Sequence, residues 1–462
     1  MGLTDDTQRH IQTRLDFSVE LTGEAREAHR GETESSAATD ERERPARTGR
    51  LMEEVCERDN LKEALRRVQA NKGAAGVDGM TVDALPDHLR QHWLAIRAHL
   101  LQGTYAPKPV RRVEIPKPDG GVRKLGIPTV LDRFIQQAVL QVLQRRWDRT
   151  FSPHSYGFRP GRSAHQAVAQ AQCYIADGCD WVVDLDLEKF FDRVNHDKLM
   201  GRVAQRVEDR RLRRLIRAFL NAGVMENGLV GPTVDGTPQG GPLSPLLSNL
   251  VLDDLDRELE RRGLRFVRYA DDCNIYVRTE RAGHRVMDRV TRFLATRLKL
   301  TVNPSKSAVA RPQERTFLGF TFAAGPTVAR AIAPKAVRRF KMKIREITRR
   351  AKGVSLETTI AELAPYMRGW RNYFGFRETP EALVYLTRWV RLRLRAALWR
   401  QWRTPRSRRA ALLALGVRPQ LAEHTAGSGL GPWYLARAKA PSVGLSNRYF
   451  DSLGLPRLID GA

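Results

Sequence analysis

The sequence predicts an α/β fold followed by an all-α region, and three observations support this prediction. Short apolar runs bounded by Gly, Pro and Asp alternate with helical patterns from about residue 51 to about residue 330. Beyond Pro334 the pattern changes to long helices rich in arginine. A hydrophobic share of 42% over 462 residues is enough for two or three domains with buried cores.

Charge distinguishes this chain from an ordinary soluble protein. Lys and Arg number 79 against 52 Asp and Glu, which gives a net charge of +27. Residues 335–462 hold 26 basic and 8 acidic residues, a net of +18, whereas residues 1–50 hold 8 and 11, a net of −3. Such a surplus attracts polyanions, and arginine suits bidentate contacts with phosphate. The composition therefore favours a protein that binds nucleic acid.

The first 50 residues read as a disordered polar leader, because "HRGETESSAATDERERPARTGR" has almost nothing to bury. The N-terminus lacks the basic-then-apolar pattern of a signal peptide, and no uncharged apolar run approaches the ~20 residues of a membrane span. The four cysteines form no CxxC pair. We therefore expect a protein of the reducing cytoplasm, with no membrane partner.

The helical segments are expected in a definite order. The first carries Leu61, Leu65 and Val68 on one face and ends at a glycine-rich turn over 73–79. Further helices are expected at about 85–103, 131–146, 196–206 and 282–299, and another begins near Ser244.

The strand-like segments stand between these helices. Runs of strand character flank "KPDGG" and "ADD", and both sequences suit tight hairpin turns. The segment "WVVDLDLEKFF", residues 181–191, has the apolar density of a buried strand. We expect a domain boundary at about 325–335, before the basic helices begin.

Aspartates occur at two of these apolar segments. Asp184 and Asp186 alternate with apolar residues, and Asp271 with Asp272 stands between two strands. Adjacent carboxylates repel one another and are costly on an apolar strand unless they are paired or bound to metal. Oxygen ligands of this kind suit Mg²⁺, and two such ions suit phosphoryl transfer. From these residues alone, the alternative that Asp271 and Asp272 are ordinary turn formers stays open.

An ordered set of motifs resembles the bacterial group II intron reverse transcriptase/maturase family. The motifs are "NKGAAGVDG", "IPKPDGGVRKLGIPTVLDR", "SYGFRPGRSAHQAV", "DLDLEKFFDRVNH", "GTPQGGPLSPLLSN", "RYADD", "NPSKS" and "FLGF". The resemblance runs from about residue 58 to about 450. It implies a right-hand polymerase, with fingers and a palm of small antiparallel sheet at 51–330. A thumb and a group II intron maturase (X) domain with a basic C-terminal tail would follow at 335–462.

The resemblance assigns the metal site residue by residue. Asp186 matches the first catalytic aspartate, and Asp271 and Asp272 match the pair on the hairpin. By that resemblance the three carboxylates hold two Mg²⁺ ions. Asp184 matches no metal-binding position, so we expect it to be a palm residue bonded to a neighbour.

The resemblance also implies a substrate-binding set. Phe191 matches the aromatic floor under the incoming sugar, where a ring would exclude a ribose 2′-hydroxyl; the alternative is core packing. Gln239 lies in "TPQGG", whose glycines would let the backbone approach the template–primer pair. Lys117 and Arg123 match the cations on the nucleotide triphosphate, and Lys306 matches a proton donor to pyrophosphate. For these three cations an exposed surface position is the alternative.

The implied function is an RNA-directed DNA polymerase that also binds its group II intron RNA, assisting splicing and retrohoming. The implied partners are the intron RNA, an RNA template with a DNA primer, dNTPs and target DNA. The implied location is the bacterial cytoplasm, with association to the nucleoid when the protein is bound to DNA. One alternative is a catalytically silent RNA-binding splicing factor, against which the three intact aspartates argue. Another is a defence or diversity-generating reverse transcriptase, against which "RGWRNYF" argues.

The C-terminal region suggests an endonuclease-lacking member of this family. Many relatives carry an HNH endonuclease with cysteine pairs and several histidines. Here no cysteine follows Cys273, and His424 is the only histidine after His284. We therefore expect second-strand priming to come from elsewhere, such as replication forks. In "LTRWVRLRLRAALWRQW", apolar residues fall on one helical face and arginines mostly on the others, which suits RNA binding.

Overall fold

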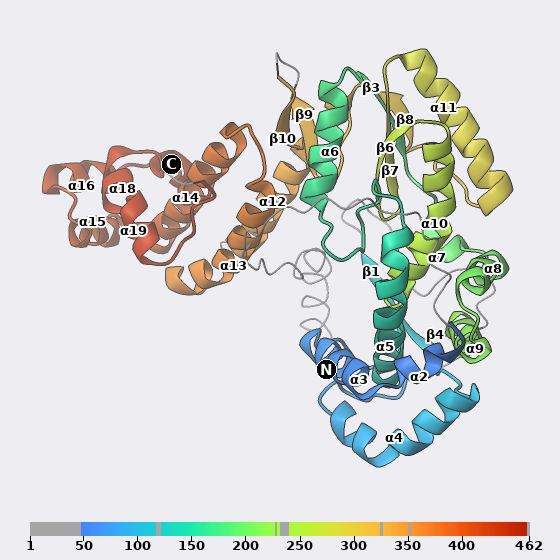
Figure 1. Ribbon diagram of the computed structural model, residues 1–462. Coiled ribbons are helices and arrows are strands. Elements are labelled where there is room, and N and C mark those ends of the chain that lie inside the picture. Colours follow the sequence, from blue (N-terminus) through green and yellow to red (C-terminus); the bar gives the residue numbers. More distant parts are fainter. Residues whose placement is uncertain are drawn as a thin grey trace, which may run out of the picture. The chain divides into compact units, whose positions relative to one another are not determined.

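The computed structural model describes residues 48–116, 122–226, 229–231, 240–323, 327–349 and 353–459. The chain divides into two compact units, 1–310 and 311–462 (Figure 1). The main helices of the first unit are α2 (Leu51–Val55), α3 (Arg58–Ala70), α4 (Leu85–Gln102), α5 (Val130–Trp147), α6 (Ala164–Ala176), α7 (Phe190–Arg193), α8 (His196–Arg206), α9 (Arg210–Leu220), α10 (Ser244–Arg261) and α11 (Glu280–Phe293). The predicted leader lies almost wholly outside the described residues.

The first sheet of this unit has the strand order β2-β1-β4-β5. Its strands are β1 (Val110–Pro116), β2 (Val122–Ile127), β4 (Val224–Glu226) and β5 (Leu229–Gly231). β1 and β2 pair antiparallel, with Pro116 opposite Val122, so the hairpin predicted around "KPDGG" is confirmed on both flanks. β1 pairs with β4 in parallel, which links this hairpin to the chain after α9.

The second sheet has the order β6-β7-β3-β8, and each neighbouring pair is antiparallel. Its strands are β3 (Trp181–Leu185), β6 (Arg265–Tyr269), β7 (Asp272–Val277) and β8 (Ala308–Ala310). A Cβ at Gly283 of α11 would touch Val183 and Val277, whereas Tyr174 of α6 contacts Tyr276. Since adjacent residues of a strand point to opposite faces, α11 and α6 cover opposite faces of this sheet.

The strand predicted at 181–191 is shorter than expected. Regular pairing ends at Leu185, although Leu187 still forms an isolated bridge with Val302. Lys189 then adopts a left-handed conformation with φ 47°, and the chain turns into α7. The strand therefore ends just before the first predicted catalytic aspartate, so that residue lies at the end of the sheet.

Local sequence explains where several helices begin. Ser163 and Gln166 form a capping box at the start of α6, and Asn195 accepts from the Lys198 amide at the start of α8. Helix α8 has the predicted bounds of 196–206. The helix predicted at 282–299 is α11 followed by a π-helical turn, η3 (Leu294–Leu298).

The second unit begins with a hairpin of β9 (Phe320–Ala323) and β10 (Ala329–Ile332), paired antiparallel. Helices follow from Pro334, as predicted. They are α12 (Pro334–Ile347), α13 (Leu356–Phe374), α14 (Glu381–Gln401), α15 (Pro405–Ala414), α16 (Pro419–Ala426), α17 (Pro432–Leu435), α18 (Lys439–Gly444) and α19 (Asn447–Ser452).

Aromatic rings join the first two of these helices. The Trp370 ring of α13 lies 4.6 Å from that of Phe340 in α12 and 4.5 Å from that of Phe374. Trp370 is therefore a core residue. Across the part of the chain that the structure describes, no helix combines the length and apolarity needed to cross a bilayer.

Candidate catalytic site

The register of the second sheet brings the predicted catalytic aspartates to one end of it. β3 pairs with β7 so that Leu185 lies opposite Cys273. The next residue of the first strand is Asp186, and the preceding residue of the second is Asp272. Continued by one residue, an antiparallel register places these two aspartates opposite each other. Asp271 stands beside them in the two-residue loop between β6 and β7.

The segment 301–307 fixes the backbone of Asp186 from the other side. The amide of Asn303 donates to the Asp186 carbonyl at 2.8 Å, and the Asp186 amide donates to Ser307 Oγ at 2.9 Å. Lys306 Nζ, on the same segment, lies 3.7 Å from Asp186 Oδ2. Sequence analysis identified Lys306 but not Asn303 or Ser307, although all three belong to the "NPSKS" motif.

The carboxylates affect one another electrostatically. Asp272 has its pKa raised to about 7, first by burial among protein atoms and then by the negative charges of Asp271, Asp184 and Asp186. The Lys306 ammonium opposes this shift. Part of the Asp272 side chain reaches the surface, so solvent screens a share of the repulsion. Asp184, which sequence analysis set aside, acts on this carboxyl together with the predicted set.

The donor chemistry of the site fits a divalent cation. Carboxylate oxygens are hard ligands, and a cation would relieve the repulsion that raises the pKa of Asp272. Among the residues the structure describes, however, no group of three or more His, Cys, Asp or Glu side chains has the spacing to hold a metal ion. The backbone brings the aspartates together, and the side chains as placed stop short of ligating geometry.

The predicted substrate-binding residues fall into two groups. Phe191 lies in α7, partly buried against the core, with its ring 5.2 Å from that of Phe190. Arg123 belongs to β2 with its backbone opposite Ile115, but its side chain lies outside the described part of the structure. Lys117 and Gln239 lie wholly outside the described residues.

The two glycines after Gln239 approach other parts of the protein closely. A Cβ at Gly240, whose φ is 130°, would lie 2.6 Å from the Gly126 carbonyl oxygen. A Cβ at Gly241 would lie 2.4 Å from Gln136 Oε1 of α5. Sequence analysis explained these glycines by the approach of nucleic acid. The structure gives them a second reason, since a side chain at Gly240 would collide with the backbone of β2 and one at Gly241 would displace the Gln136 side chain of α5.

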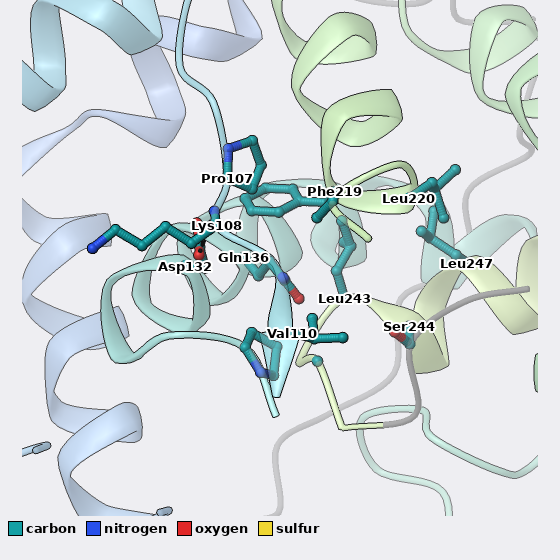
Figure 2. Close-up of a pocket in the computed structure, with 13 residues that line it drawn as sticks. Pro107, Lys108, Val110, Asp132, Gln136, Phe219, Leu220, Leu243, Ser244 and Leu247 are labelled. Atoms are coloured by element: carbon teal, nitrogen blue, oxygen red, sulfur yellow. Dashed lines mark hydrogen bonds between the residues drawn. The ribbon is translucent and has the colours of Figure 1, made fainter. Parts of the chain in front are cut away.

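A small pocket lies beside Gly241 (Figure 2). Figure 2 shows the polar side chains of Lys108, Asp132, Gln136 and Ser244 together with apolar side chains such as Phe219 and Leu243. Asp132 accepts hydrogen bonds from the Tyr105 and Thr129 hydroxyls. Burial raises the pKa of Asp132, and these hydrogen bonds oppose the shift. None of the predicted site residues lines this pocket.

A fully buried arginine lies directly behind the aspartate turn, and sequence analysis did not single it out. Arg268 of β6 has no exposed surface and forms an ion pair with the equally buried Asp256 of α10 at 2.6 Å. Its Nη1 donates to the Ala270 carbonyl at 2.8 Å and to Asn249 Oδ1 at 3.0 Å. An arginine inside an apolar strand was the signal in the sequence, but its partners could not be read there.

In the second unit, cations surround an aromatic face of α12 and α14. The charged groups of Arg345, Arg393 and Lys341 lie 5.5 to 5.8 Å from the Trp389 ring centre. Lys341 Nζ also lies 4.4 Å from the Tyr385 ring centre, and half of Tyr385 is exposed. Trp389 itself is buried, so the positive charge lies beside one exposed ring, that of Tyr385, which is available for stacking.

Two family models match the chain, the first mainly within the first unit and the second within the second unit. "Reverse transcriptase (RNA-dependent DNA polymerase)" matches residues 115–322, which include all three predicted catalytic aspartates. "Group II intron, maturase-specific domain" matches residues 337–415, which include the aromatic face of α12 and α14.

Curated relatives match mainly over part of their length. Protein YkfC of Escherichia coli is 39% identical over 224 residues, covering 47% of this chain and 59% of YkfC. The group II intron-encoded protein LtrA of Lactococcus lactis is 37% identical over 206 residues, covering 44% of this chain and 34% of LtrA. A putative COX1/OXI3 intron 2 protein of Saccharomyces cerevisiae is 32% identical over 203 residues, covering 43% of this chain and 23% of that protein. The matches thus span less than two thirds of each relative.

Proposed function

Because the chain belongs to the group II intron reverse transcriptase/maturase family, we propose that it is an RNA-directed DNA polymerase that also binds its intron RNA. Residues 51–330 form the fingers and palm in this proposal, and residues 335–462 form the thumb and maturase domain. The observation that carries it is the β3–β7 register, which brings Asp186 to the hairpin of Asp271 and Asp272.

The metal site is part of the proposal. Asp186, Asp271 and Asp272 would hold two Mg²⁺ ions. When bound, these ions would activate a primer 3′-hydroxyl for attack on a dNTP and neutralise the charge of the departing pyrophosphate. The protein contributes a rigid sheet end, with the Asp186 backbone fixed by Asn303 and Ser307.

The remaining residues would act on the substrates. Lys306, whose Nζ lies 3.7 Å from Asp186 Oδ2, would give a proton to pyrophosphate. Phe191 would form the floor under the incoming sugar, and Gln239 would contact the template–primer pair. Lys117 and Arg123 would bind the triphosphate. RNA template, DNA primer, intron RNA and target DNA are the proposed partners, and splicing with retrohoming is the proposed biological role.

Primer extension tests this function. The full chain with Mg²⁺, dNTPs and a primed RNA template should extend the primer, and Asp271→Ala should reduce the rate about 10³-fold, since it removes a ligand that stabilises charge in the transition state. Asp184→Asn, at a position with no proposed ligand role, is the matched control and should stay within about tenfold of wild type. A wild-type chain that binds RNA but extends no primer would favour the silent splicing factor.

The same assay examines the role of Phe191. With NTPs in place of dNTPs, the wild-type chain should extend poorly. Equal extension with NTPs and dNTPs would contradict the proposed steric role of this ring without contradicting the polymerase activity.

A further inference from the structure

The loop that carries Asp271 has a conformation its own residues do not favour. Ala270 and Asp271 connect Tyr269 to Asp272, and Ala270 has a φ of 57°. Positive φ at the first of two loop residues is the pattern of a type II′ hairpin turn, in which glycine normally occupies that position. An alanine there needs surrounding structure to hold it.

The Arg268 side chain supplies that structure with all five of its N–H groups. Nε and Nη2 donate to the two carboxylate oxygens of Asp256 at 2.7 and 2.6 Å, and Nη2 also donates to Ser155 Oγ at 2.7 Å. Nη1 donates to Asn249 Oδ1 and to the carbonyl of Ala270 itself. A guanidinium has five donors in a fixed plane, so each bond restricts the direction of the others.

The second half of the arrangement is a backbone segment pressed against the loop. Asn249 Nδ2 donates to the Gly157 carbonyl at 2.9 Å. A Cβ at Gly157 would lie 2.2 Å from the Ala270 nitrogen, so only glycine fits. Tyr156 and His154 exchange backbone hydrogen bonds with Arg268. The loop is therefore held at the Ala270 carbonyl by the guanidinium and contacted at the Ala270 nitrogen by Gly157.

We infer that Arg268, Asn249, Ser155 and Gly157 form a turn clamp, a set of positioning residues that fixes the left-handed conformation of Ala270 and thereby the direction of Asp271 and Asp272. This inference rests on the proposed function only for its consequence at the metal site. The effect of the clamp on the conformation of the loop can be measured without substrate.

Two variants in α10 distinguish a specific effect of the clamp on the loop from a general loss of stability. Asn249→Ala removes a clamp residue and leaves the Gly157 carbonyl without its donor. Asp253→Asn is the matched control, because Asp253 is also buried in α10 but forms its salt bridges with Arg206 and Arg257, neither of which belongs to the clamp. Both variants should lower the melting temperature.

Amide hydrogen exchange of the full chain reads the loop directly. In Asn249→Ala the peptide covering residues 266–276 should exchange at least tenfold faster than in wild type, whereas in Asp253→Asn it should change less than twofold. Adding Ala270→Gly to Asn249→Ala should restore at least part of the affinity for Mn²⁺, because glycine adopts positive φ freely.

Mn²⁺ affinity connects the clamp to the proposed metal site. It is measured from the decrease in the EPR signal of free Mn²⁺ as the protein binds the ion. Asn249→Ala should weaken binding at least fivefold and Asp253→Asn less than twofold. Unchanged exchange at 266–276 in Asn249→Ala, or equal effects of both variants, would overturn the inference. If the exchange result holds but the wild type neither binds Mn²⁺ nor extends a primer, the clamp stands and the proposed function fails.

Discussion

Asp272 shows how strongly one residue of this site depends on its neighbours. Although part of the side chain is exposed, desolvation of its carboxyl and the charges of three further aspartates raise its pKa to about 7. The folded chain then binds a proton that the unfolded chain has already released above the ordinary pKa of 3.8. Stability is therefore lost as pH rises from about 4 through 7, and the loss is complete above the folded-state pKa.

We predict that Asp272→Asn stabilises the metal-free protein in a pH-dependent way. The gain in the free energy of unfolding should be small near pH 4 and grow toward pH 7. Above pH 7 it should level off at about 1–2 kcal/mol, after allowance for solvent screening at this partly exposed side chain. Urea unfolding in EDTA at pH 4.5, 6 and 8 measures it. Asp83→Asn, an exposed aspartate in another turn, is the control. A gain independent of pH would contradict the assigned cause.

At the level of elements, α11 packs at a glycine on the second sheet of the first unit, β6-β7-β3-β8. A Cβ at Gly283 would lie 2.5 Å from Val309 Cγ1, and Val277 and Val183 stand just beyond it. Gly201 of α8 provides the comparison, because a Cβ there would meet nothing within 4 Å. One glycine permits packing between a helix and a sheet, and the other only weakens its helix.

Alanine at these two positions should therefore have opposite effects. Gly283→Ala should destabilise by about 1–3 kcal/mol through overpacking. Gly201→Ala should stabilise by about 0.5–1 kcal/mol, because glycine is a poor helix former. The free energy of unfolding of each variant, from urea titration, gives the result, and effects of the same sign would disprove the packing explanation.

Sequence patterns predicted most of these elements because helix and strand periods are local properties. The bounds of α8 and the strands flanking both hairpins could be predicted without any knowledge of tertiary contacts. The register that brings Asp186 to Asp272 could not be predicted, since it depends on pairing between residues 88 or more positions apart in the chain, as Leu185 is from Cys273. The partners of Arg268 were hidden for the same reason, as they come from α10 and from the chain before α6.

At the scale of the whole molecule, positive charge is distributed unevenly. Residues 335–462 carry +18 of the net +27. The cations around Trp389 and Tyr385 in α12 and α14 belong to this excess. Binding of a polyanion by such a surface releases condensed counterions, so its affinity depends on salt.

We predict that RNA affinity of the full chain falls about 10³-fold or more between 50 and 200 mM KCl, as expected for six or more phosphate contacts. Replacing Lys341, Arg345 and Arg393 by glutamine should make the slope of log K against log salt shallower by up to about three. Arg66→Gln in α3, where Arg66 pairs with Glu63, is the control and should leave the slope unchanged. Filter binding at four salt concentrations measures each slope, and salt-independent affinity would exclude phosphate contacts.

The turn clamp also bears on how this hairpin can be transplanted. The residues that hold Ala270 come from three separate stretches of chain, around residues 155, 249 and 268. A designer who copies only β6, the loop and β7 into another sheet moves the aspartates without the groups that orient them. The smallest portable unit is the hairpin with α10 and the segment 152–159, and a graft of the hairpin alone needs glycine in place of Ala270.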